Sequence, residues 1–350
     1  MKLLKLPYLA QKEVLKQMEY AELFLLSFLS KRSMRMIQSV KRKEIKNIDI
    51  LTSSCFINID SYKFCAGSDK KVIVTLYPEA FESDETLRKE ISLGNVVCSM
   101  EYKRRKKSNR YFQSLIVYYF YSEMETLSMI VYNQLKALFG NGVTFSLNIQ
   151  DSALGYNSLP TFFNTKRSEM SLGTLLNAQV LENYFMNVQE QEYLSIAING
   201  LSGYLSPNSK FYNTQELDIK CGEWYWGIDV LSHFKGRILR LITASDIDNE
   251  ICQFIARWKS CQELKNFECL AIFMESRGLR NIEEIRRKFG FKDLTPEQQV
   301  FGQKKRSNHS SYIVRDDGIV AKMLIDRFFI VMEVQSFTEE QMLKGTEVRV

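Results

Sequence analysis

The hydrophobic pattern of this 350-residue chain changes its period near residue 47. Before that point, as between Leu9 and Met18, apolar residues recur at intervals that keep them near one helical face. After it, short apolar runs bounded by turn residues are typical of β-strands. The change predicts a small helical module over residues 1–46 and a large mixed α/β domain over residues 47–350.

The N-terminal module has room for three short helices. Leu6-Pro7 precedes the first, and proline is well tolerated in the first turn of a helix. The run Leu23–Leu29 is too apolar for a single amphipathic stripe, and a third helix follows over Met34–Val40. Three helices in so few residues bury little surface, so this module needs a partner surface.

The positive charge of the chain is concentrated in the same module. The whole chain has a formal charge of +6, but residues 1–46 hold eleven Lys and Arg against four Glu, a net charge of +7. The remaining residues are close to neutral. A basic module on a neutral body predicts one acidic partner for that module.

The stretch Leu6 to Ile37, LPYLAQKEVLKQMEYAELFLLSFLSKRSMRMI, resembles an F-box. The opening Leu6-Pro7 and the step Ser30-Lys31-Arg32 match its pattern without a gap, whereas Ser33 stands where tryptophan is usual. The resemblance implies docking on a Skp-family adaptor, an acidic protein that bridges to a cullin. The alternative is a generic three-helix cap packed on the larger domain.

We expect the adaptor contact to bury aliphatic side chains in partner pockets, with basic residues orienting the encounter. The predicted contact residues are Leu6, Pro7, Val14, Leu15, Met18, Leu26 and Ile37.

The body predicts alternating strands and helices. Strands are expected at 56–59, 72–76, 96–100, 114–118, 145–149, 194–196, 217–219, 239–241, 270–272 and 328–334, and helices at 124–138, 175–184 and 251–258. Asp248 is a candidate N-cap, Trp258 a candidate core residue, and Asp317-Gly318 a hairpin turn. The four strands between 194 and 272 recur at spacings of 23, 22 and 31 residues, which is the range of leucine-rich-type repeats.

Parts of the body also resemble the F-box-associated type 2 domain, which accompanies F-boxes in a family expanded in nematodes. The similar segments include LDIKCGEW at Leu217–Trp224 and RDDGIVA at Arg315–Ala321, and the resemblance is clearest over 194–335. The expected fold class is therefore α/β: a three-helix F-box, then a mixed α/β domain with β-hairpins and irregular leucine-rich-repeat-like units. The resemblance implies that the body recruits a protein substrate.

The sequence predicts a substrate receptor of a Skp–cullin–F-box ubiquitin ligase and not an enzyme. It contains no GxGxxG, GxxxxGK[ST] or GxSxG motif. Seven cysteines without a CxxC pair, and only His233 and His309, give no familiar zinc spacing. We expect no catalytic residue, metal or cofactor, reduced cysteines and an intracellular protein without a membrane span.

Two further surfaces are candidates for binding. Tyr225 and Trp226 could contact a substrate, although aromatic residues of this kind are more often core. The basic clusters at 103–107 and 304–306 support an alternative, a ligase-independent scaffold or nucleic-acid-associated repeat protein. Nucleic acid is the less favoured partner because the first cluster contains no aromatic residue on which a base could stack.

Overall fold

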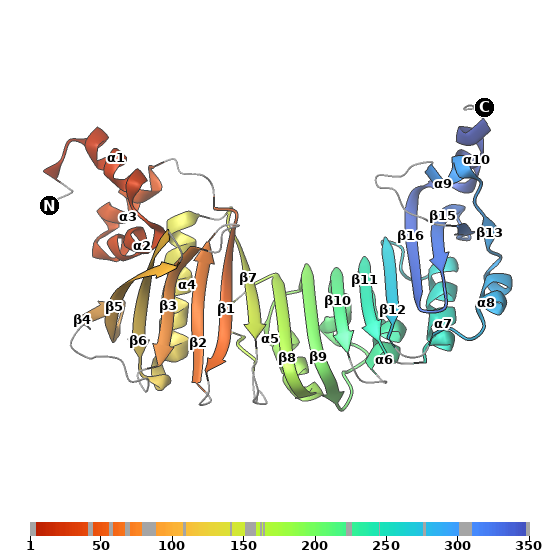
Figure 1. Ribbon diagram of the computed structural model, residues 1–350, viewed down its shortest axis with the longest axis horizontal. Helices are drawn as coiled ribbons and strands as arrows, with labels where there is room; N and C mark the ends of the chain where they lie inside the picture. The colour runs from red at the N-terminus through yellow and green to blue at the C-terminus, as the bar shows by residue number, and fades with distance from the viewer. Residues whose placement is uncertain are drawn as a thin grey trace. The chain divides into compact units, whose positions relative to one another are not determined.

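The computed structural model describes residues 5–40, 45–55, 59–66, 71–78, 89–107, 110–140, 142–150, 159–161, 163, 165–221, 226–244, 246–275, 278–300 and 310–347 (Figure 1). The chain forms two compact units. The first comprises Met1–Leu154 and Pro160–Glu169, and the second Gly155–Leu159 and Met170–Val350. Three N-terminal helices are followed by a mixed α/β domain, which confirms the predicted fold class.

The first unit begins with α1 (Tyr8–Gln17), α2 (Tyr20–Leu29) and α3 (Lys31–Gln38). Its strands have the order β7-β1-β2-β3-β6-β5-β4, with β1 parallel to β7, β3 parallel to β6 and the other neighbours antiparallel. The bounds are β1 (Asn47–Cys55), β2 (Ile59–Ala66), β3 (Lys71–Pro78), β4 (Lys89–Leu93), β5 (Val96–Lys107), β6 (Arg110–Tyr119) and β7 (Thr144–Gln150). The 3-10 turn η3 (Tyr121–Glu123) and α4 (Met124–Phe139) connect β6 to β7.

Strand β3 explains why the helices of this unit sit where they do. Residues 73–76 are all buried, which is the burial pattern of a strand covered on both faces. Helix α2 packs against β3 and against α4. The predicted strands at 72–76, 96–100, 114–118 and 145–149 and the helix at 124–138 are confirmed. The predicted strand at 56–59 falls mostly on residues outside the described ones.

The second unit is a sheet of order β8-β9-β10-β11-β12-β16-β15-β14-β13. Its elements are β8 (Arg167–Asn177), α5 (Ala178–Asn187), β9 (Tyr193–Ser202), η4 (Lys210–Asn213), β10 (Glu216–Cys221), α6 (Trp226–His233), β11 (Ile238–Thr243), α7 (Asp248–Lys259), β12 (Cys269–Met274), α8 (Ile282–Phe289), β13 (Lys292–Asp293), α9 (Pro296–Val300), β14 (Ser311–Val314), β15 (Ile319–Ile325), β16 (Phe329–Thr338) and α10 (Glu339–Glu347). Strands β9 to β12 are parallel, and β12 to β13 pair antiparallel through β16, β15 and β14.

The four strands predicted from their spacing lie side by side in one register. Leu194, Leu217, Leu239 and Leu270 pair in sequence across β9, β10, β11 and β12, and all four are fully buried. Helices follow between the strands, as parallel pairing requires. The chain therefore repeats a strand-and-crossover unit in this region.

Two local predictions in the second unit were wrong. Leu175 and Leu176 belong to the end of β8, and the helix starts only at Ala178, where the Asn177 side chain accepts from the Gln179 backbone N–H at 2.8 Å. Asp248 is the first residue of α7 and not its N-cap; its carboxylate accepts instead from the Arg280 backbone N–H.

Two other predictions, the core position of Trp258 and the hairpin turn at Asp317-Gly318, were confirmed. Trp258 is fully buried. Gly318, at φ +88°, turns the hairpin between β14 and β15, a conformation that glycine adopts without a Cβ penalty.

Candidate protein-interaction site

Local side-chain hydrogen bonds cap the starts of α2 and α3. The Ser30 hydroxyl caps α3 by accepting from the Ser33 backbone N–H at 3.0 Å. At the start of α2, Glu19 and Glu22 form a reciprocal capping box, in which Glu22 accepts from the Glu19 N–H at 2.8 Å. These two caps satisfy backbone N–H groups at the starts of α2 and α3 that would otherwise lack partners, which helps short helices follow one another closely.

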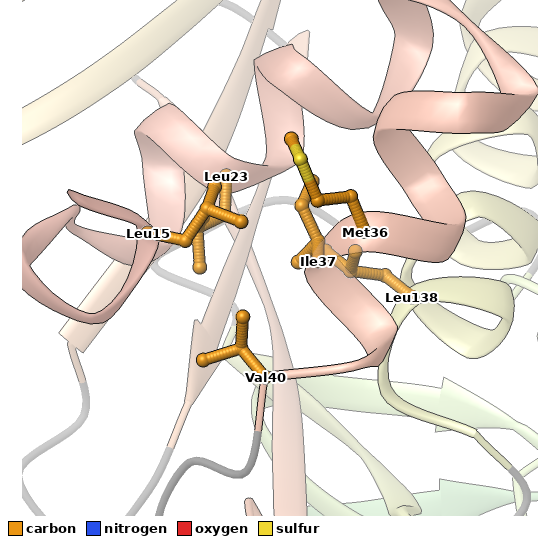
Figure 2. Packing of buried hydrophobic residues seen from close by; sticks show 6 residues of the cluster. All are labelled: Leu15, Leu23, Met36, Ile37, Val40 and Leu138. Carbon is orange, nitrogen blue, oxygen red and sulfur yellow. The ribbon is translucent and has the colours of Figure 1, made fainter. Parts of the chain in front are cut away.

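The core of these helices includes a residue that lies about a hundred positions further along the chain. Leu15, Leu23, Met36, Ile37 and Val40 pack together with Leu138 of α4, as Figure 2 shows. The core of the N-terminal helices is therefore completed by a side chain of α4.

Polar and aromatic contacts also join α2 and α3 to α4. Gln38 donates to the Ala137 carbonyl at 2.6 Å, and Gln134 donates to the Ser27 hydroxyl at 2.7 Å. The Tyr20 and Phe139 rings meet edge to face, with centroids 6.0 Å apart. Helix α4 is thus bonded to both α2 and α3.

The predicted contact residues divide by burial. Leu15 is 0% exposed and Ile37 is 5% exposed, so both hold the core and neither offers a surface to a partner in this conformation. Leu6, Val14, Met18 and Leu26 are half-buried, and Pro7 is exposed. That these residues contact an adaptor stays a prediction.

The most exposed apolar side chains of the module were missed by the sequence analysis. Leu9 is 76% and Leu29 is 74% exposed, and Tyr8, also exposed, has Lys12 4.5 Å above its ring. The hydrogen bond from Lys12 lowers the pKa of the Tyr8 hydroxyl. The apolar spacing between Leu9 and Met18 predicted that Leu9 shares the helical face of its neighbours, and the structure leaves this side chain exposed.

An open groove lies along α2 and α3, with one lining residue from α4. Its lining is Ser27, Phe28, Ser30, Lys31, Met34, Arg35, Gln38 and Gln134. Lys31 and Arg35 are exposed and basic, while Phe28 and Met34 supply apolar surface. The groove therefore suits an acidic segment that also carries an apolar side chain.

The substrate-contact prediction for Trp226 has no support from its position. Trp226 is only 4% exposed and stacks on Phe211, with ring centroids 5.5 Å apart. Tyr225 lies outside the described residues. A buried indole offers a partner little surface.

The described residues provide no group of three His, Cys, Asp and Glu side chains that could hold a metal ion. His233 pairs with Asp229 one turn earlier on α6, at 3.2 Å between Nδ1 and Oδ1. His309 and the basic cluster at 304–306 lie outside the part of the chain that the structure describes. Residues 103–107 form the end of β5 and pair with β6. Within the described helices, none is long and apolar enough to cross a membrane.

Comparison with known proteins identifies the N-terminal module. Residues 3–45 match the F-box domain, so this chain carries an F-box domain made of α1, α2 and α3. An F-box domain implies binding to a Skp-family adaptor and, through it, to a cullin. No curated protein and no solved structure matches the chain.

Proposed function

We propose that this protein is the substrate-receptor subunit of a Skp–cullin–F-box ubiquitin ligase. The observation that carries the proposal is the F-box domain at residues 3–45. Such a receptor performs no chemistry itself. It holds a substrate near the loaded conjugating enzyme and so raises the effective concentration of the reacting groups. An intracellular location is part of the same proposal, because the ligase acts there.

In this proposal the adaptor covers the exposed apolar residues of α1 and α2. Leu9 and Leu29 are large, apolar and mostly exposed, and exposed Pro7 precedes α1. Burying a leucine side chain contributes about 1.5–3 kcal/mol, so two such residues account for a substantial part of a stable association. Half-buried Leu6, Val14, Met18 and Leu26 are further candidate contact residues of the same module.

The first experiment is co-purification of the full chain with a Skp-family adaptor. We compare wild type with Leu9→Asp and Leu29→Asp, because both side chains are exposed and their loss leaves the core intact. The control is Phe120→Asp, which changes an exposed aromatic residue outside the F-box domain. We expect wild type and the control to retain the adaptor and the two leucine variants to lose most of it. Equal retention by all four would refute this contact surface, and no retention by wild type would refute the receptor proposal.

We further propose that the α/β body recruits the substrate and is an F-box-associated domain of type 2. The segments that motivate this proposal fall on defined elements: Leu217–Cys221 within β10, and Arg315–Ala321 on the β14–β15 hairpin. The strand-and-crossover repeat of β9 to β12 supports the proposal, because repeats of this kind present extended surfaces. Mass spectrometry of ubiquitinated proteins in cells with the full chain and with an F-box-only chain tests the role of the body.

A further inference from the structure

The sheet of the second unit has two different faces. One face of β9 to β12 carries fully buried residues such as Leu217, Leu239 and Leu270. Figure 1 shows α5 and α6 behind these strands. The alternate residues of the same strands point to the other face, and most of them are half-buried or exposed.

An uncovered face is unusual for parallel strands. Parallel sheets occur almost always with both faces covered, because each crossover and its partners pack on the strands. Here strands β9 to β12 alternate strictly between buried and more accessible residues over most of their length. Among the residues that the structure describes, one face of these parallel strands is therefore buried and the other is more accessible.

The open face carries an apolar patch over three neighbouring strands. The register places Ile242 beside Phe273 and Phe273 beside Phe329, on β11, β12 and β16. The rings of Phe273 and Phe329 have centroids 6.5 Å apart, and Phe273 is 50% exposed. We define the open-face patch by its members: Ile242, Ala271, Phe273, Phe329 and Val331. Phe273 is exposed and the other four are half-buried. A continuous apolar surface of this kind marks an interaction site more often than scattered single residues do.

A polar row borders the patch on β9, β10 and β11. Asp218 accepts from the Tyr193 hydroxyl at 3.2 Å and from Arg240 Nη1 at 3.1 Å. The Arg240 side chain remains 46% exposed, so the guanidinium has donors at the surface for a second acceptor. The row therefore holds the Arg240 guanidinium at the edge of the apolar patch.

The ionisable groups of the open face nearly balance. Asp218 pairs with Arg240 across β10 and β11, and buried Lys322 lies beside Glu333 in the register of β15 and β16. Glu216 and Lys220 both lie on β10. Opposite charges on neighbouring strands neutralise one another and leave no field of one sign. The face therefore selects against a strongly acidic or strongly basic partner.

We propose that the open-face patch binds the substrate polypeptide, through a segment rich in apolar side chains and carrying little net charge. Phe273 and Phe329 contact the apolar side chains of that segment, and Arg240 donates to one of its oxygen atoms. The apolar character of the patch and the balance of charge around it select this occupant over an acidic or basic peptide. This inference rests on the proposed receptor function and names the substrate class for it.

The test selects peptides from a random twelve-residue phage library on the full chain bound to its Skp-family adaptor. Enriched peptides are then synthesised, and their affinities are measured for wild type, Phe273→Ser, Phe329→Ser and Arg240→Ala. Met186→Ser is the matched control, because Met186 is an exposed apolar residue on α5. Adaptor retention and thermal unfolding are recorded for each variant, so loss of the adaptor or of the fold is separated from loss of the peptide.

We expect enriched peptides that are apolar and nearly neutral. Each phenylalanine variant should bind them about tenfold more weakly, with unchanged adaptor retention, and the control should match wild type. Enrichment of strongly charged peptides, binding that ignores Phe273 and Phe329, or no enrichment at all would overturn the proposal. A chain that self-associates through this patch, seen as a dimer by light scattering that Phe273→Ser abolishes, would overturn it too.

Discussion

At the scale of single residues, two leucines of α1 have opposite environments six positions apart. Leu15 is fully buried against Leu23 and Leu138, whereas Leu9 is largely exposed. Their replacement should therefore affect different properties of the protein.

Leu15→Ala should destabilise the first unit by about 2–5 kcal/mol, because it removes buried methyl groups and leaves a cavity. Leu9→Ala should change the free energy of unfolding by less than about 0.5 kcal/mol. Urea denaturation followed by circular dichroism measures both. Similar losses in the two variants would contradict the core assignment shown in Figure 2.

A second prediction at this scale concerns the buried thiol of Cys98. Burial, followed by the nearby charge of Glu123, raises the pKa of this thiol to about 11, against an ordinary 9.0. The unfolded chain releases the proton first, so the stabilising contribution is complete below pH 9 and is lost as the pH rises toward 11.

Cys98→Ala should therefore show a shallower loss of stability than wild type between pH 8.5 and pH 10.5. The measurement is urea denaturation at several pH values in that window. Because Cys269 has a raised pKa for the same principal reason, burial, Cys98→Ala should retain part of the alkaline loss. Identical pH profiles for wild type and variant would count against the Cys98 assignment.

At the scale of elements, the boundary between α2 and α3 depends on one side chain. Ser30 is the last residue before α3 and its hydroxyl accepts from the Ser33 N–H. Ser30→Ala should cost about 1 kcal/mol of stability, and Ser30→Asp, which restores an acceptor near the helix N-terminus, should recover most of it. Thermal unfolding of the two variants measures the difference. Equal melting temperatures for Ser30→Ala and wild type would show that the cap contributes nothing.

The elements also show how far the sequence determines the fold. Strands β9 to β12 could be predicted because each buries every second residue over most of its length, and their leucines align in register. The start of α5 was misplaced because Leu175 and Leu176, at the end of a strand, also fit the helical spacing that follows. Asn177, which caps the helix, was the signal that locates the boundary.

The candidate site was harder to predict than the fold. The apolar stripe of a helix shows which side is buried but not whether the cover is the chain itself or a partner. The sequence pattern at Leu15 and Ile37 is the same whether the chain itself or a partner covers these side chains. Only the position of α4, from a distant part of the sequence, shows that the chain covers them. The open-face patch depends on the pairing of β12 with β16, which skips three strands of the chain order.

At the scale of the whole molecule, the charge distribution separates the basic module proposed to bind the adaptor from the nearly neutral body proposed to bind the substrate. The basic excess belongs to residues 1–46, and the groove beside α3 displays Lys31 and Arg35. If an acidic adaptor binds there, Lys31→Glu combined with Arg35→Glu should slow association severalfold and weaken its dependence on salt. Surface plasmon resonance between 50 and 300 mM salt measures both effects. An unchanged salt dependence would show that this groove takes no part in adaptor binding.

The junction between α3 and α4 also bears on the order of events during synthesis. The Gln38–Ala137 hydrogen bond joins residues 99 positions apart, and Leu138 fills the core of the F-box helices. At about 5–20 residues per second, a ribosome needs roughly 5–20 s to extend the chain over that interval. We expect ribosome-arrested chains exposing only residues 1–80 to capture the adaptor poorly and chains exposing residues 1–170 to capture it well. The emerging F-box would then recruit its ligase only after the first unit has been translated.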